Sequence, residues 1–87
     1  MIELLEDVKK ALRISTNHFD GEIESLILAG ESDLRLAGIY FVGYNDPLIK
    51  RAIITYCKTH FGYDNPEADR FNDSYVMLKQ HLCLAGD

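Results

Sequence analysis

The chain has 87 residues, 47% of them hydrophobic, and a formal net charge of −5, which suits one globular domain and is too short for two. Its 14 acidic residues outnumber 9 basic ones, and the longest basic run is a pair such as Lys9-Lys10 or Lys50-Arg51. Because DNA binding needs a basic face that neutralises phosphates, this balance argues against it. The acidic N-terminus does not resemble a signal peptide and no stretch is long enough to span a membrane, so we expect a cytosolic protein.

The first helical segment is expected from Ile2 to Ile14, and the loop residues Ser15–Asn17 end it. Its acids precede its bases, an order that the helix dipole favours. The apolar stripe is predicted to consist of Leu4, Leu5, Val8 and Leu12. The charged residues of the segment are predicted to face water: Glu3, Glu6, Lys9, Lys10 and Arg13.

The second helical segment is expected from Asp20 to Ala37, with Asp20 as the N-cap and Gly38 as the residue that ends it. Gly30 lowers the helix propensity in mid-segment, which indicates a close approach of another helix. The carboxylates of this segment are interpreted as helix-start partners of the dipole or as a solvated face. The buried stripe is predicted to consist of Ile23, Leu26, Ile27, Gly30, Leu34 and Ala37.

The third and fourth segments share a start signal, a capping residue followed by proline. Asp46-Pro47 opens the third segment, which ends at Gly62, and Asn65-Pro66 opens the fourth, which reaches Leu84. Their predicted apolar stripes are Ile49, Ala52, Ile53, Tyr56, Cys57 and His60 or Phe61, and then Phe71, Ser74, Tyr75, Leu78, His81 and Leu82. Together the segments predict an all-α fold, a compact bundle of about four helices forming one domain over residues 1–87.

The linker between the second and third segments, Ile39–Asn45, is strongly apolar and aromatic, whereas most loops are polar. It is expected either to tuck under the helices or to pack on another molecule. Leu28 and Leu84 add further apolar side chains that the helical stripes leave unexplained. A small chain with such a surplus often buries it in an oligomer, so the sequence favours a module that binds other protein chains.

Four residues carry the reactive groups to consider: Cys57, His60, His81 and Cys83. They are zinc-ligand types, but His81 and Cys83 are two residues apart on one helix and point to different sides, so the four do not easily converge. A Cys57 nucleophile with a His60 base lacks a third residue that orients the histidine. We therefore expect reduced, buried cysteines, no metal, no cofactor and no catalytic site, and an enzyme or metal protein is only a distant alternative.

Four pieces of sequence resemble, in this order, the head–tail connector (head-completion adaptor) proteins of tailed bacteriophages and prophages. They are Leu5–Ile14; Asp20-x-x-Ile23-x-x-Leu26-Ile27 with Leu34; Pro47–Ile53 with Tyr56 and Phe61-Gly62; and Phe71-x-x-Ser74-Tyr75-x-x-Leu78-x-x-x-Leu82. The resemblance covers nearly the whole chain and rests on core and capping positions. Gly30 and the loop Asn17–Phe19, which is less acidic than usual, depart from the family pattern.

The resemblance implies a structural protein that assembles as a ring under the portal, extends the DNA exit channel and docks stopper or tail proteins. Its implied partners are further copies of itself, although the free protein is a monomer in some connectors, together with the portal and a stopper or tail-completion protein. These would meet in the bacterial host cytoplasm during assembly and remain in the virion neck. DNA would pass without specific binding, which the net acidity favours because acids repel phosphates, and no membrane is involved.

A head-to-tail ring requires two different patches on each subunit. We assign one patch to the outer face of the second segment around Leu28. The other patch is assigned to the linker residues Tyr40, Phe41, Val42 and Tyr44. The main alternative function is a small helical DNA-binding regulator, for which the third segment offers only Lys50, Arg51 and Lys58 as basic residues.

Overall fold

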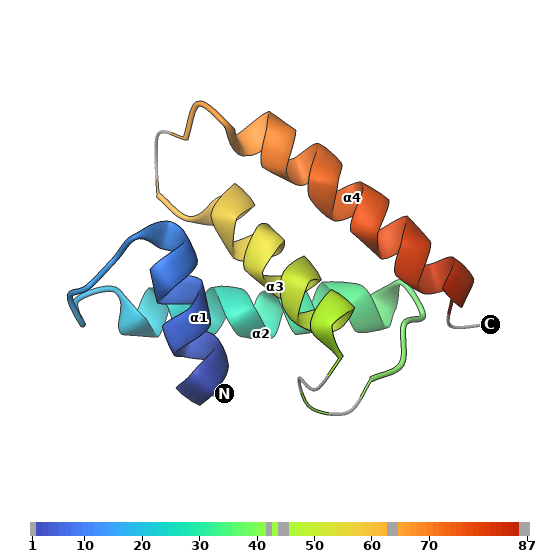
Figure 1. Cartoon of the computed structure of the whole chain (residues 1–87), viewed down its shortest axis with the longest axis horizontal. Coiled ribbons are helices and arrows are strands. Elements are labelled where there is room, and N and C mark those ends of the chain that lie inside the picture. Colours follow the sequence, from blue (N-terminus) through green and yellow to red (C-terminus); the bar gives the residue numbers. More distant parts are fainter. Residues whose placement is uncertain (1, 42, 44–45, 63–64, 86–87) are drawn as a thin grey trace.

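The computed structural model describes residues 2–41, 43, 46–62 and 65–85, and this part of the chain folds into four α-helices. They are α1 (Ile2–Leu12), α2 (Asp20–Leu36), α3 (Pro47–His60) and α4 (Ala68–Ala85). The predicted compact all-α fold is confirmed. Helix α3 lies in the middle and contacts each of the other three, with α4 packed along one side of it and α2 crossing behind (Figure 1).

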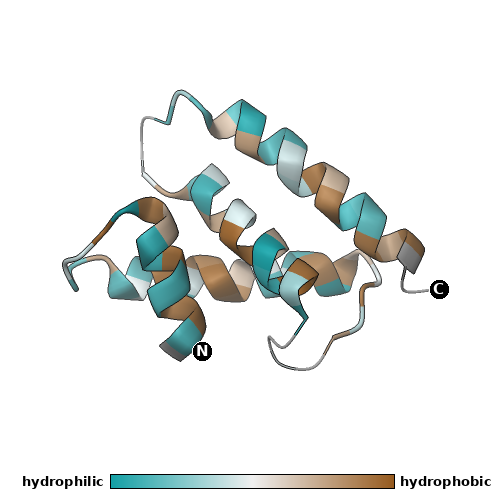
Figure 2. Cartoon of the chain, viewed as in Figure 1, coloured by the Kyte–Doolittle hydropathy of each residue, from teal (hydrophilic) through white to brown (hydrophobic). Residues whose placement is uncertain are grey.

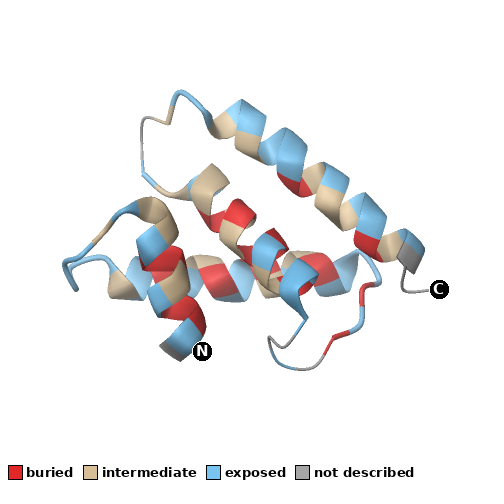
Figure 3. Ribbon diagram, in the orientation of Figure 1, coloured by how far each residue is buried: buried red, intermediate tan, exposed pale blue. Residues whose placement is uncertain are grey.

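The hydrophobic core lies where α1, α2 and α3 meet, because apolar residues repeat along each of these helices (Figures 2 and 3). Most of the predicted stripe positions are buried or half-buried, whereas Ala37, His60, Ser74 and His81 are exposed. Among the described residues, the linker contributes two core residues and α4, the longest helix, two more. The buried apolar residues are Leu4, Leu5, Val8, Ile23, Ile27, Leu34, Ile39, Phe41, Ile49, Ala52, Ile53, Cys57, Tyr75 and Leu82.

Helix α1 ends two residues earlier than the periodicity predicted. Arg13 adopts a left-handed backbone with φ of 61°, and its N–H donates to the Lys10 carbonyl at 3.1 Å. The Ile14 N–H donates to the Lys9 carbonyl at 2.9 Å. These two bonds form a Schellman motif, which normally places glycine where Arg13 stands. The sequence therefore gives no glycine signal for this helix end.

The start of α2 corrects two predictions. Asp20 is not the N-cap; Phe19 occupies that position without a side-chain capping bond. The Asp20 carboxylate instead lies 2.9 Å from the Lys9 ammonium, which also donates to Asn17 Oδ1 at 2.9 Å. Lys9 was expected to face water but is only 4% exposed, because its aliphatic stem packs on apolar surface while its charge is paired.

The other helix ends agree better with the sequence. Gly38 ends α2 with φ of 90°, and the Ile39 N–H closes a second Schellman motif on the Leu34 carbonyl at 3.1 Å. Asp46 caps α3 as predicted, since its Oδ1 accepts from the Leu48 N–H at 2.9 Å. Helix α4 begins two residues later than expected, after a turn.

That turn is fixed by Asn65. Its Oδ1 accepts from the Glu67 N–H at 3.1 Å, and its Nδ2 donates to the Lys58 carbonyl near the end of α3 at 2.7 Å. One side chain thus joins the end of α3 to the entry of α4 and sets where α4 starts.

Gly30 confirms the predicted close approach between helices. A Cβ placed there would lie 3.2 and 3.3 Å from Cδ1 and Cγ of Tyr56 on α3. The ring of Tyr56 also packs edge-on against Tyr75 of α4 with centroids 5.3 Å apart. The glycine therefore lets α2 and α3 pack with a tyrosine between them, and that tyrosine in turn contacts α4.

Candidate subunit-docking surfaces

The linker places its two described aromatic residues in opposite environments. Phe41 is buried, with the Arg35 guanidinium 4.3 Å from the centre of its ring. Tyr40 is 88% exposed. Val42 and Tyr44, predicted for the same patch, lie outside the described residues. Of the described linker residues, Tyr40 offers a large apolar side chain to a partner, whereas Phe41 belongs to the core of its own protomer.

Helix α2 turns an uncharged face away from the core. Its buried residues face α1 and α3, and the opposite face, at about 100° per residue, consists entirely of small residues and two leucines. Leu28 is 50% and Leu36 is 88% exposed. We call this face the α2 seam; its residues are all exposed and comprise Gly21, Ser25, Leu28, Ala29, Ser32 and Leu36.

Acidic residues flank the α2 seam at its N-terminal end. Glu22 and Glu24 are both exposed, and neither makes an ion pair with the described residues. Helix α2 as a whole carries five acids and one base, whereas α3 carries three bases and no acid. The small residues of the seam allow close approach of another surface, and the charge around it favours a basic one.

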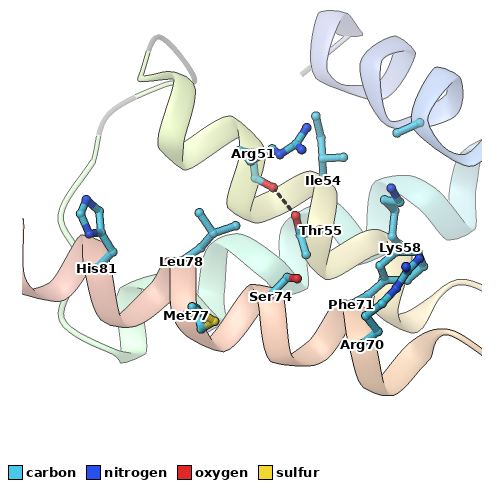
Figure 4. A pocket seen from close by; sticks show the side chains of 11 residues that line it. Arg51, Ile54, Thr55, Lys58, Arg70, Phe71, Ser74, Met77, Leu78 and His81 are labelled. Atoms are coloured by element: carbon cyan, nitrogen blue, oxygen red, sulfur yellow. Dashed lines mark hydrogen bonds between the residues drawn. The ribbon is translucent and has the colours of Figure 1, made fainter.

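A groove of about 620 Å³ runs between α1, α3 and α4. Its apolar walls come from Ala11, Ile54, Phe71, Met77 and Leu78, and its polar lining from Arg51, Thr55, Lys58, Arg70, Ser74 and His81. Figure 4 shows Lys58, Arg70 and Phe71 gathered at one end and His81 at the other. A second hollow of about 430 Å³ shares four of these residues and extends the groove to Arg13 and Glu67. We call the two together the basic groove.

The cations of the basic groove make no ion pair between helices in the described part of the chain. Arg51 and Lys58 make no ion pair within the described part of the chain, and Arg70 pairs with Glu67 at 2.7 Å on an exposed turn. Lys58 Nζ and Arg70 Cζ instead lie 4.7 and 5.3 Å from the centre of the Phe71 ring. This ring therefore holds two positive charges from different helices at one end of the groove.

Ion pairs between elements use other cations. Lys50 of α3 lies 2.8 Å from Asp7 of α1, and this contact holds the pKa of the Asp7 carboxyl below its ordinary value. Lys79 of α4 lies 3.1 Å from Asp33 of α2, with Tyr75 on the same carboxylate. Asp33 was predicted to belong to a solvated face, so its role in joining α2 to α4 corrects that prediction.

The two cysteines lie in different environments. Cys57 is fully buried, and burial raises the pKa of its thiol to about 12. Cys83 was expected to be buried but is half-exposed, and its thiol donates to the Ala37 carbonyl at 3.5 Å. Within the described ranges, no three His, Cys, Asp or Glu side chains are grouped as metal ligands. No helix among those residues has the length and apolarity needed to cross a membrane.

Comparison with known proteins identifies the family. The family model described as "Phage connector protein" matches residues 4–87. The chain belongs to the phage connector protein family. This places it among structural proteins of phages and agrees with the resemblance found in the sequence. Neither the curated proteins nor the solved structures contain a significant match to the connector chain.

The basic groove is the feature that sequence reasoning missed. Its lining residues lie on three helices far apart in the chain, so no local motif reveals them. One signal was present, since the third segment has bases and no acids inside an acidic chain. The sequence pattern by itself relates those bases only to DNA binding. Lys50 is paired with Asp7, and Arg51 and Lys58 line the groove.

Proposed function

We propose that this connector assembles as a ring under the portal of a phage head. The ring extends the DNA exit channel and offers its far side to a stopper or tail-completion protein. Assembly takes place in the host cytoplasm, and the protein stays in the virion neck. The observation that carries this proposal is the α2 seam, an uncharged helix face that the protomer itself leaves uncovered.

The subunit contacts include Leu28 on the seam, and Tyr40 supplies a further contact to a neighbouring subunit or to the portal. Both side chains are large, apolar and at least half-exposed, and packing them against another protein removes that surface from water. The net charge of −5 favours passage of DNA without specific binding, because acids near the channel repel phosphates.

Mixing the connector with its cognate portal and imaging the product by electron microscopy tests the proposal. We expect a closed ring of connector density, coaxial with the portal. The single substitutions Leu28→Asp and Tyr40→Asp should weaken ring assembly; both positions are exposed, so the protomer stays folded. Connector that remains unbound, with a portal lacking an added ring, would contradict the proposed function.

The alternative of a DNA-binding regulator has one supporting observation, the cations that line the basic groove. A gel-shift with duplex DNA at low salt distinguishes it from the connector function. Tight binding that weakens steeply with salt would favour the regulator. The connector function predicts no retarded complex in the same assay.

A further inference from the structure

We infer that the basic groove of one connector subunit receives the α2 seam of a neighbouring copy. This inference rests on the proposed ring and names the two surfaces that meet in it. A ring formed by a head-to-tail contact needs two different patches that fit each other. The seam and the groove are different patches, because none of the residues lining the groove belongs to α2.

The shapes of the two surfaces suit each other. The seam is a helix face of small residues and two leucines, so little bulk prevents it from entering a groove. The groove offers apolar walls from Ile54, Met77 and Leu78 for Leu28 and Leu36. Six residues of α4 line the groove, the first being Arg70 and the last His81. These two residues lie eleven steps apart along the helix, which corresponds to about 16 Å or three turns of an incoming helix.

The charges are complementary as well. Arg51, Lys58 and Arg70 line the groove within an acidic protein, and two of them make no ion pair in the described part of their own protomer. Glu22 and Glu24, on either side of the seam, likewise make none there. Charge pairing of this kind steers association and fixes register more than it adds affinity.

These features also predict the register. Glu22 and Glu24 of one copy should lie at the end of the groove where Lys58 and Arg70 surround Phe71. Leu36, twelve residues or about 18 Å beyond Glu24 along α2, then reaches the end of the groove near Met77 and His81. The spacing of acids and leucines along the seam therefore matches the spacing of cations and apolar walls along the groove.

A second copy of the chain fits the groove better than nucleic acid does. A phosphate backbone would leave the apolar walls of the groove, including Ile54 and Met77, uncovered. Lys50, the remaining base of α3, is held by Asp7 at 2.8 Å and is absent from the groove lining. An apolar surface flanked by cations is complementary to an apolar surface flanked by acids. The α2 seam, with Glu22 and Glu24 beside it, is such a surface.

Chemical cross-linking of rings assembled on the portal tests the contact directly. One connector variant carries Ser25→Cys on the seam and another carries Ser74→Cys in the groove, both with Cys83→Ser to remove the half-exposed thiol. Rings made from a mixture of the two, treated with a short bismaleimide, should yield cross-linked dimers. Rings of either variant alone should yield none, because the contact is head-to-tail. In the matched control, Asn72→Cys, which lies on another side of α4, takes the place of Ser74→Cys.

Charge reversal tests the pairing. The double variant Lys58→Glu/Arg70→Glu and the double variant Glu22→Lys/Glu24→Lys should each lower the yield of rings at least about tenfold. A chain carrying all four reversals should recover ring formation. Lys10→Glu reverses an exposed cation of α1 outside the groove and should leave assembly unchanged. Circular dichroism verifies that each variant is folded.

The outcomes separate the inference from the proposed function. Normal rings from every reversal variant, with no cross-link between positions 25 and 74, would overturn the groove contact and leave the ring standing. Normal rings combined with DNA binding that Lys58→Glu/Arg70→Glu abolishes would overturn it in favour of a nucleic-acid groove. Failure of the unmodified protein to form any ring would remove both proposals.

Discussion

The hydroxyl of Tyr75 on α4 donates to the carboxylate of Asp33 on α2 at 2.5 Å, across 42 positions of the sequence. The same carboxylate oxygen accepts from Lys79 at 3.1 Å. Tyr75 is almost fully buried, so its hydroxyl depends on this acceptor. The bond joins the longest helix to a helix with which it otherwise shares few contacts.

Removing that hydroxyl should loosen α4. We expect Tyr75→Phe to lower the free energy of unfolding by about 1 kcal/mol. This is less than the roughly 1.5–3 kcal/mol of a bond to a charged group, because water reaches part of the Asp33 side chain. Urea unfolding followed by circular dichroism measures the change. Lys79→Met is the matched comparison and should cost less, since its ammonium is more exposed. Equal stability of Tyr75→Phe and the unmodified protein would show that the bond contributes nothing.

Stability should also fall in acid through Asp33. The Tyr75 hydrogen bond, and then Lys79, lower the pKa of Asp33 below its ordinary value of 3.8. A carboxyl whose pKa is lower in the folded state stabilises the fold above the ordinary value and loses that contribution as the pH falls through the folded value. Thermal unfolding between pH 5 and pH 2.5, about the span over which this occurs, should show a shallower loss of Tm for Asp33→Asn. If Asp33→Asn lost Tm with falling pH as steeply as the unmodified protein, Asp33 would not contribute to the acid response. Other carboxyls such as Asp7 would then account for it.

The two thiols should react very differently. Burial raises the pKa of the Cys57 thiol to about 12, so at neutral pH it is neither exposed nor ionised, and the thiolate is the reactive form. Cys83 is half-exposed near the end of α4. Under native conditions we expect one alkylated thiol per chain by intact mass, lost in Cys83→Ser, and two in urea. Rapid labelling of Cys57 in the native protein would contradict this prediction and support the alternative in which Cys57 is a nucleophile.

Arg13 should be replaceable with a gain in stability. It ends α1 with a left-handed backbone, a conformation that costs residues with a Cβ about 1–2 kcal/mol and glycine very little. We expect Arg13→Gly to raise the free energy of unfolding by about 0.5–1 kcal/mol, with Arg13→Ala close to neutral because the strain remains. If both variants changed stability alike, the effect would come from the lost charge.

Two glycines of α2 should respond in opposite ways to alanine. Gly21 has open space around it, so Gly21→Ala should gain about 0.5 kcal/mol from helix propensity. At Gly30 the new methyl group would press on the root of the Tyr56 ring at 3.2–3.3 Å. We expect Gly30→Ala to lose about 1 kcal/mol, since overpacking outweighs propensity. Urea unfolding curves of the two variants measure these changes. Higher stability of both variants would show that the Tyr56 ring moves aside without cost.

Local signals predicted most of the fold and little of the site. Asp46-Pro47 and Gly38 mark helix ends through their own backbone chemistry, and they were read correctly. The roles of Lys9 and Asp20 were predicted wrongly because the two side chains form an ion pair between α1 and α2, which no local sequence pattern reveals. The end of α1 at Arg13 was not predicted because glycine, and not arginine, is the usual residue at this position of a helix C-terminus. The basic groove required three helices to be in place before its lining residues became neighbours.

The small share of α4 in the core has a consequence for how the molecule opens. Among its described residues, Tyr75 and Leu82 are the only buried apolar side chains, whereas the rest of the core comes from α1, α2, α3 and the linker residues Ile39 and Phe41. Regions that bury few apolar side chains unfold locally at lower free energy than the rest. Backbone amides of α4 should therefore exchange with deuterium sooner than those of α2 and α3. Separation of α4 from the other three helices is therefore the expected first step of opening, and a partner that binds α4 should slow exchange along this helix.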